Sequence, residues 1–230
     1  LELDRRNHRE LTTSGWWVRM NYEHASSDDV APVALPGVIR SSIPTDGYSF
    51  GRLTLDARRY TRLTPNTRIN LRLWAGGWLG GDPLPIQHRL SLGGPDLLPG
   101  YRFRAFTCAA GGYSDPAMPA LCDRTVALQA EFRSRLSLGL GYQYRDRNRR
   151  ELDRFIGIEE ADLVLFSDAG KAWLTGNGPG RVPNNRIPNL NEWKADAGVG
   201  IDAGGIGVYL TKALTDGEPV RLFVRLRRRF

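Results

Sequence analysis

Hydrophobic and polar residues alternate with a period of two along the stretch from Glu192 to Phe230. One face of its first segment is wholly apolar and consists of Trp193, Ala195, Ala197, Val199 and Ile201. After a tight turn at Gly204 and Gly205 the alternation resumes, and it returns once more from Val220 to Phe230. A period of two is typical of β-strands, because successive side chains of a strand point to opposite faces. The pattern therefore predicts three antiparallel strands in this part of the chain.

The same alternation marks further strands before residue 192. The predicted strands cover residues 16–23, 49–60, 67–79, 125–135 and 162–173, and residues 1–9 have the pattern of the end of another strand. Residues 136–160 leave two interpretations open, either an extension of the flanking strands or a wet turn that carries a short helix. The chain is thus expected to form about eight strands and part of a ninth.

Alternation alone fits either a soluble sandwich, whose apolar face packs on a core, or a membrane barrel, whose apolar face meets lipid. Three features favour the barrel. The segments run to about ten residues, the length that a tilted strand needs to cross a bilayer. The last strand ends on an aromatic residue, and the polar faces are rich in Arg, Asp and Gly, which suits a water-filled lumen. The predicted fold class is all-β: an antiparallel transmembrane β-barrel of the bacterial outer membrane, in contact with the lipid bilayer and lipopolysaccharide.

The connections between the predicted strands differ in length. Residues 25–47 and 80–124 show no sustained period and contain several prolines, whereas the connector at residues 64–66 is short. Outer-membrane barrels have this asymmetry, with short turns on the periplasmic side and long loops outside. The lengths of the connections therefore agree with the barrel prediction.

The chain has 230 residues and a formal net charge of +7, and only three of its 32 basic residues are lysines. Such a charge raises the question of nucleic-acid binding. The arginines, however, occupy alternate strand positions and do not cluster with aromatic residues, so we expect no nucleic-acid partner.

The sequence has no run of about eighteen apolar residues, which excludes a transmembrane helix. Leu1 opens in the middle of a strand pattern without a signal peptide, so we expect the sequence to be a fragment.

Cys108 and Cys122 both lie in the long stretch that is rich in Gly, Pro and Ser. We expect them to form one disulfide in an oxidising compartment, with two free thiols as the alternative.

The histidines lie singly, without the spacing of metal ligands. The run from Gly198 to Ala203 mimics a dinucleotide-binding fingerprint, but an alternating strand follows it where that motif requires a helix. The sequence also lacks a Gly-x-Ser-x-Gly elbow, so it predicts no enzyme, no cofactor and no metal site.

Several short motifs occur in a defined order along the chain. They are Leu3-Asp4-Arg5 with Thr13-Ser14-Gly15, Leu92-Gly93-Gly94, Leu98-Pro99-Gly100-Tyr101, the run Phe166 to Trp173, and the hairpin from Gly198 to Leu214 with the terminal Phe230. In this order they resemble the bacterial surface antigen family, the family of the BamA and TamA outer-membrane assembly factors. The resemblance covers nearly the whole chain. It implies that residues 1–230 are the carboxy-terminal part, about eight to nine strands, of a sixteen-stranded barrel that periplasmic POTRA domains usually precede.

The resemblance also implies a site inside the barrel. The long loop, residues 80–124, is expected to fold into the lumen, where its tip would meet an acidic residue of the inner wall. The tip residues are Pro99, Gly100, Tyr101, Arg102 and Arg104, and the wall residues are Asp168 and its neighbour Glu131. In the family the tip carries an Arg where this chain has Pro99, so we hypothesise that Arg102 or Arg104 supplies the charge. An Arg paired with a carboxylate suits such a site, because each charge alone is costly where water is scarce. The alternative is that both arginines are solvated loop residues.

The terminal strand has a role of its own in the family. Its residues Leu222, Val224, Leu226 and Phe230 resemble the signal by which barrels are recognised for insertion. The strand is expected to form one side of a weakly paired seam that offers its edge to the strands of client proteins.

The predicted function is therefore non-catalytic, the insertion or translocation of outer-membrane proteins, which are the expected partners. Two alternatives stay open. In the first, the barrel serves as a pore or membrane anchor for an amino-terminal effector, such as a patatin-like lipase. In the second, the chain alone closes into a small barrel of eight to ten strands.

Overall fold

The computed structural model of the chain describes residues 1–9, 11–28, 47–103, 105, 106, 108, 121–145, 153–177 and 181–226, with the backbone alone at residues 86, 140–145 and 153–159. Ten strands lie in these residues and belong to one sheet. In chain order the elements are β1 (Glu2–Asp4), β2 (Gly15–Ser27), β3 (Tyr48–Arg62), β4 (Thr67–Gly81), the 3-10 helix η1 (Ile86–His88), β5 (Arg124–Arg145), β6 (Asp153–Thr175), β7 (Arg181–Val182), the 3-10 helix η3 (Leu190–Glu192), β8 (Lys194–Ala203), β9 (Ile206–Ala213) and β10 (Arg221–Arg225). No helix in the described ranges is long and apolar enough to cross a membrane.

Strands that follow one another along the chain are also neighbours in the sheet, in the order β1-β2-β3-β4-β5-β6-β8-β9-β10. Every pair on this path is antiparallel, and the two-residue β7 lies parallel to the end of β6. Within the described part of the chain β1 pairs with β2 alone and β10 with β9 alone. The all-β antiparallel fold is confirmed, and these residues form an open sheet rather than the small closed barrel that the sequence left as an alternative.

The two faces of the sheet are the reverse of those in a soluble domain. One face buries charged and amide side chains, namely Arg68, Asn70, Gln129, Glu131, Arg133, Asp162, Asp168, Asp196 and Asp202. The other face leaves large apolar side chains exposed, among them Met20, Leu71, Leu128, Leu165, Val199, Ile201, Val208 and Leu210. A soluble sheet would bury these leucines and valines against a core. An apolar exterior around a polar interior is the arrangement of a barrel wall in lipid.

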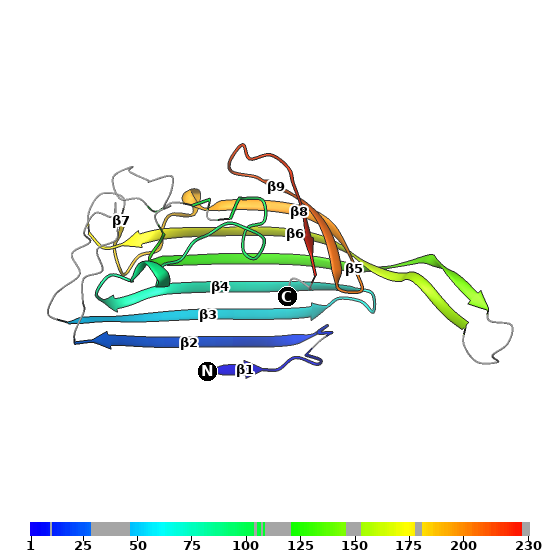
Figure 1. Ribbon diagram of the computed structural model, residues 1–230, viewed down its shortest axis with the longest axis horizontal. Coiled ribbons are helices and arrows are strands. Elements are labelled where there is room, and N and C mark those ends of the chain that lie inside the picture. Colours follow the sequence, from blue (N-terminus) through cyan, green and yellow to red (C-terminus); the bar gives the residue numbers. More distant parts are fainter. Residues whose placement is uncertain are drawn as a thin grey trace.

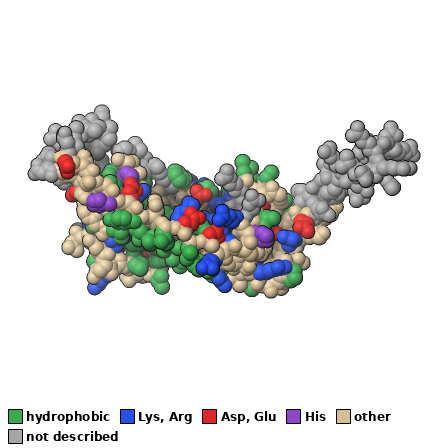
Figure 2. Space-filling view, turned by 90° about the horizontal axis from the view of Figure 1, so that it is seen from below, with side chains coloured by type: hydrophobic (Ala, Val, Ile, Leu, Met, Phe, Trp, Pro, Cys, Tyr) green, Lys and Arg blue, Asp and Glu red, His purple; other side chains and the backbone are tan. Residues whose placement is uncertain are grey.

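The sheet curves along its path, so that β8, β9 and β10 turn over the polar face of β5 and β6 (Figure 1). The ring of Phe166 on β6 lies 6.4 Å from the ring of Phe223 on β10, with ring centroids as reference. Seen from below, charged side chains gather in the middle of the molecule beside a continuous area of hydrophobic side chains (Figure 2). The polar face is therefore the hollow side of the sheet, as the inside of a partial barrel would be.

Consecutive strands are antiparallel, so their connections alternate between two ends of the sheet. The connectors at residues 63–66 and 204–205 lie at one end, which we call the short-turn end. The segment between β4 and β5, residues 82–123, lies at the opposite end. Gly204 and Gly205 both have positive φ, +60° and +90°, which the tight two-residue turn between β8 and β9 requires.

Residues 136–160, which the sequence left ambiguous, extend the flanking strands where the structure describes them. β5 continues to Arg145 and β6 begins at Asp153. The alternation is hard to follow there because the register shifts between Ser137 and Leu140, and Gly139 adopts a φ of +55°. A bulge of this kind inserts an extra residue and so interrupts the period of two.

Aromatic rings cover the polar face of the last strands. Tyr209 on β9 stacks on Phe223 of β10, with ring centroids 5.1 Å apart and an interplanar angle of 12°. The rings lie close to the backbone because the facing positions are glycines. A Cβ atom at Gly198 would overlap the ring of Phe166, and one at Gly200 would overlap the ring of Tyr209. The inward glycines of β8 are thus places where a ring lies flat on the strand.

Candidate functional site: the long loop on the polar face

We call residues 82–123 the long loop, and its described part rests on the polar face of the sheet. Two of its leucines, Leu92 and Leu98, are 0% exposed and belong to a cluster with Ala127 and Ala172. Burying such a side chain contributes about 1.5–3 kcal/mol. The wall makes room for them at Gly170, where a Cβ would come within 3.0 Å of Leu98 and 3.1 Å of Leu92. The family motifs around Leu92, Leu98 and Gly170 therefore meet in space.

The tip of the loop is a β-turn over Leu98 to Tyr101. The N–H of Tyr101 donates to the carbonyl of Leu98 at 3.1 Å, and Pro99 occupies the second position of the turn, where its fixed φ is favourable. The N–H of Gly100 donates to Oδ2 of Asp196 on β8 at 2.6 Å, and Asp196 is fully buried. A Cβ at Gly100 would lie only 2.6 Å from the Cβ of Asp196. The turn can approach this carboxylate because residue 100 is glycine.

Tyr101 fastens the other side of the tip. Its hydroxyl donates to the carbonyl of Ala195 at 3.2 Å and shares a hydrogen bond of 2.6 Å with the hydroxyl of Thr215. Its ring lies 4.9 Å from that of Phe106. Burial raises the pKa of the Tyr101 hydroxyl above its ordinary value, so the group stays protonated and remains a hydrogen-bond donor.

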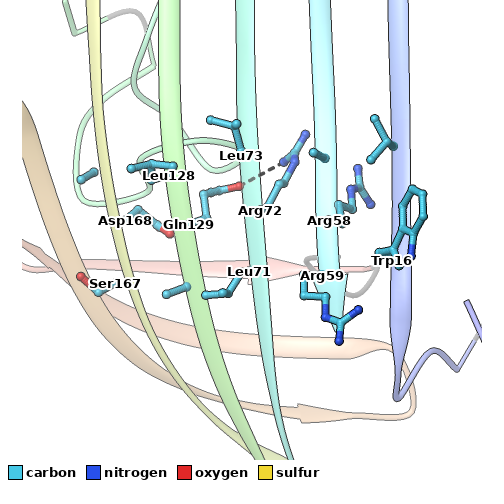
Figure 3. A pocket seen from close by; sticks show the side chains of 14 residues that line it. Trp16, Arg58, Arg59, Leu71, Arg72, Leu73, Leu128, Gln129, Ser167 and Asp168 are labelled. Carbon is cyan, nitrogen blue, oxygen red and sulfur yellow. Dashed lines mark hydrogen bonds between the residues drawn. The ribbon is translucent and has the colours of Figure 1, made fainter. Parts of the chain in front are cut away.

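Polar side chains form a row across the wall beneath the tip. In register from β3 to β8 they are Arg58, Arg72, Gln129, Asp168 and Asp196. Nη1 of Arg72 donates to Oε1 of Gln129 at 3.1 Å (Figure 3), and both arginines bind Asp56 at 2.8 Å. Nε2 of Gln129 donates to the loop carbonyls of Asp96 and Leu97 at 3.1 and 2.9 Å. The two arginines of the row share the carboxylate of Asp56 within the wall, and the loop lies over Gln129 and the acidic half.

A second group of charges lies on the same face nearer the short-turn end and connects four strands. Arg133 on β5 lies 2.5 Å from Glu131, 2.7 Å from Asp202 on β8 and 3.3 Å from Asp162 on β6. Arg68 on β4 lies 2.8 Å from the same Asp162. All five side chains are nearly or fully buried. Each carboxylate therefore has a guanidinium partner on its own or a nearby strand, which is what makes burial of these charges tolerable.

The predicted site residues are placed as follows. Asp168 is buried beside Asp196, its register partner on β8. Glu131 is also buried, where it accepts from Arg133 and from Asn70 at 3.0 Å rather than from the loop. Arg102 is 73% exposed, and its ion pair at 4.0 Å is with Glu218. Arg104 lies outside the described residues.

The two cysteines form a disulfide in the structure, with Cα atoms 5.2 Å apart. Cys122 also exchanges two backbone hydrogen bonds with Leu90, at 2.7 and 2.8 Å. The bond thus joins the part of the loop that follows the tip to the base of β5.

The terminal strand presents the expected apolar face. Leu222, Val224 and Leu226 are all exposed, and Phe230 lies outside the described residues. On the polar face, Nη2 of Arg225 lies 3.8 Å from Oδ1 of Asp96 in the long loop. The loop therefore reaches the last described strand as well as β5 and β8.

Sequence reasoning missed the wall residues that bind the loop. The alternation shows that Asp196 and Gln129 point to the inner face of their strands. Nothing in the sequence shows where along the strands the loop contacts that face. One signal of a different contact was Pro99, which stands where the family has Arg. A tip without this guanidinium binds the wall through a backbone N–H instead. A carboxylate is the strongest acceptor for that donor.

An outer apolar face around a buried polar wall, with a loop seated on that wall, defines an outer-membrane β-barrel type of protein. The Omp85 superfamily domain matches residues 1–204. The chain therefore belongs to the Omp85 superfamily, whose members are in general outer-membrane proteins concerned with the insertion or translocation of proteins. A comparison with curated proteins gives no significant match.

Replacing Arg133 should strongly destabilise the wall. Arg133→Met leaves Glu131 and Asp202 without a guanidinium partner and Asp162 with Arg68 alone, and breaking such a buried pair costs about 3–5 kcal/mol. The thermal unfolding midpoint of the detergent-solubilised protein measures the effect. Arg135→Met is the matched control two residues further along β5, where an exposed pair with Glu160 contributes only about 0–1 kcal/mol. Equal midpoints for the two variants would contradict the role assigned to the cluster.

Replacing Gly100 should unseat the tip of the loop. The new Cβ of Gly100→Ala collides with Asp196, so the N–H bond is lost and trypsin should cut after the loop arginines faster than in the unchanged protein. Gly80→Ala is the control, because a Cβ there meets nothing within 4 Å. If both variants are cut at the rate of the original protein, the tip does not depend on this close approach.

Proposed function

We propose that the chain inserts or translocates outer-membrane proteins without catalysis, as an assembly factor of the BamA/TamA type. The observation that carries the proposal is the Omp85 match over residues 1–204, together with a loop whose tip binds Asp196 and whose residues 96 and 97 bind Gln129. In this proposal the chain is the carboxy-terminal part of a sixteen-stranded barrel in the outer membrane. Its partners are lipid, lipopolysaccharide and client proteins, with POTRA domains upstream.

The seam of the barrel would include the terminal strand. β10 has five residues and pairs only with β9 in the described part of the chain. It is held to its neighbour from the inside by the Tyr209–Phe223 stack, and the loop reaches it at Arg225. A strand with one paired edge can offer its other edge to an incoming strand. The loop would steady this strand while the outer edge stays available.

Asp168 is proposed to act with Asp196 as the acidic wall site for the loop. Both side chains are buried and lie opposite each other in the register of β6 and β8. Two adjacent carboxylates favour a cationic or hydrogen-bond-donating partner, and the tip supplies at least the N–H of Gly100.

Neutralising Asp168 should therefore loosen the loop. Asp168→Asn removes the charge at nearly constant volume, and we expect lower protection of the loop against protease and a lower temperature for the gel-mobility change on heating. Asp28→Asn, an exposed position beyond β2, should change neither. Unchanged values for Asp168→Asn would remove Asp168 from the site.

Insertion itself is tested with the full-length protein in proteoliposomes. A urea-unfolded outer-membrane barrel is added, and its folding is followed by its heat-dependent gel mobility. Folding should be faster than with empty liposomes. Phe223→Ala should change this rate because it removes the inner hold on β10, whereas Val208→Ala, on the outer face of β9, should not.

The second candidate function is a pore or membrane anchor for an amino-terminal effector. The residues upstream of Leu1 separate the two, because POTRA repeats favour assembly and a Gly-x-Ser-x-Gly domain favours the anchor. A protein that conducts ions in a planar bilayer but leaves client folding at the rate of empty liposomes would support the second function and contradict the first.

A further inference from the structure

β5 and β6 are much longer than the strands beside them. They have 22 and 23 residues, whereas β2, β3, β4, β8 and β9 have 8 to 15. β5 pairs with β4 only as far as Ser134, and β6 pairs with β8 only from Asp162 onward. Beyond these points the two strands pair with each other alone, as far as Arg145 with Asp153. We call these paired segments, residues 136–145 and 153–161, the ribbon.

The ribbon projects from the sheet at the short-turn end (Figure 1). Since a strand advances about 3.3 Å per residue, a segment of about ten residues reaches on the order of 30 Å. At the base of the ribbon Arg135 lies 3.5 Å from Glu160, and the two side chains are 45% and 57% exposed. This open ion pair belongs in water, and hydrocarbon excludes strand edges with unpaired backbone groups. The ribbon therefore extends into the aqueous compartment at that end.

Both outer edges of the ribbon lack a partner strand among the described residues. Natural proteins protect such edges with Pro, with charged residues and especially Lys, with bulges, or by keeping the strand short. The ribbon contains neither Pro nor Lys, and its segments of ten and nine residues are about as long as the whole strands β8 and β9. The bulge at Ser137 to Leu140 lies at its base and so disrupts the edge of β5 only there. Two long backbone edges are thus open to pairing.

We propose that the ribbon is a docking edge for an extended strand of the client protein before that strand reaches the membrane. The proposal rests on the proposed function, and it adds a binding surface separate from the terminal strand and from the long loop. Pairing along an edge uses backbone N–H and C=O groups, so it accepts strands of many sequences. This suits a partner class defined by its β-strands rather than by a sequence motif.

Charge and surroundings favour this occupant over two others. The ribbon segments carry two basic residues, Arg145 and Arg154, and three acidic ones, Asp153, Glu159 and Glu160. This near balance gives no preference for an anionic membrane surface. A second copy of the chain would offer only a few folded edges, those of its ribbon, β1 and β10, whereas an unfolded client offers many strands with free backbone groups.

The first experiment removes the ribbon from the full-length protein. Leu136 and Ala161 are directly paired, so residues 137–160 can be replaced by Asn-Gly, a dipeptide suited to a two-residue hairpin turn. The variant should keep the heat-dependent gel mobility of a folded barrel. In the proteoliposome assay, the initial rate of client insertion should fall severalfold. A folded variant that inserts clients at the original rate would overturn the proposal.

The second experiment does not depend on the shortened protein folding. Ser137→Cys, exposed at the base of the ribbon, is mixed with a urea-diluted client that carries single cysteines in its strands, and disulfides are trapped by oxidation. Thr61→Cys, exposed at the same end of the sheet on β3, is the control. Trapping of client from residue 137 and not from residue 61 is expected. Equal trapping from both, or trapping of a second copy of the protein instead of the client, would refute the ribbon as a client site.

The two proposals fail in different ways. If the unchanged protein does not speed client folding, the assembly function fails, and trapping at residue 137 still decides whether the ribbon binds unfolded strands. If the unchanged protein is active but the ribbon neither traps client nor affects the rate, only the docking edge is lost.

Discussion

Charged side chains on the inner face of the sheet must find partners on neighbouring strands, and the register of the wall depends on this requirement. Arg133 pairs with carboxylates on β5, β6 and β8 at once, and Arg68 connects β4 to the same group. A slip of one residue in any of these strands would turn its charges to the apolar face and its leucines inward. Because an unpartnered buried charge is far more costly than a lost apolar contact, the charge cluster selects one pairing among those that the alternation allows.

The same requirement explains how the long loop is held. The two arginines of the polar row share Asp56, and the other side of the row, which consists of Gln129, Asp168 and Asp196, lies beneath the loop. The loop answers mainly with backbone groups, the N–H of Gly100 and the carbonyls of residues 96 and 97. Contact through the backbone demands a close approach. This is why Gly100 and Gly170 lie where the loop and the wall touch.

Most of the fold was predictable because the lipid-facing and inner positions differ so sharply in polarity. The alternation located nine strands, and the turn at Gly204 and Gly205, without reference to tertiary contacts. It lost the pattern at Ser137 to Leu140, since a bulge displaces the phase while the residue types stay ordinary.

The site was less predictable than the fold. The sequence placed Asp168 and Glu131 on the inner face, yet Glu131 binds Arg133 and the residue that receives the tip is Asp196. The face to which a side chain points follows from the local alternation. Which residues of that face lie beneath the loop depends on how nine strands are staggered against one another. Arg102 illustrates the same limit, because its side chain points outward to Glu218 from a backbone position only two residues from the buried Gly100.

The disulfide between Cys108 and Cys122 imposes an order on biogenesis. The bond forms only in an oxidising compartment, and thiol exchange needs access to the sulfur atoms. Cys122 is completely enclosed once the loop has packed. We therefore expect oxidation before the loop closes over the base of β5. A chain that packed its loop first would have to reopen the loop to acquire this covalent bond.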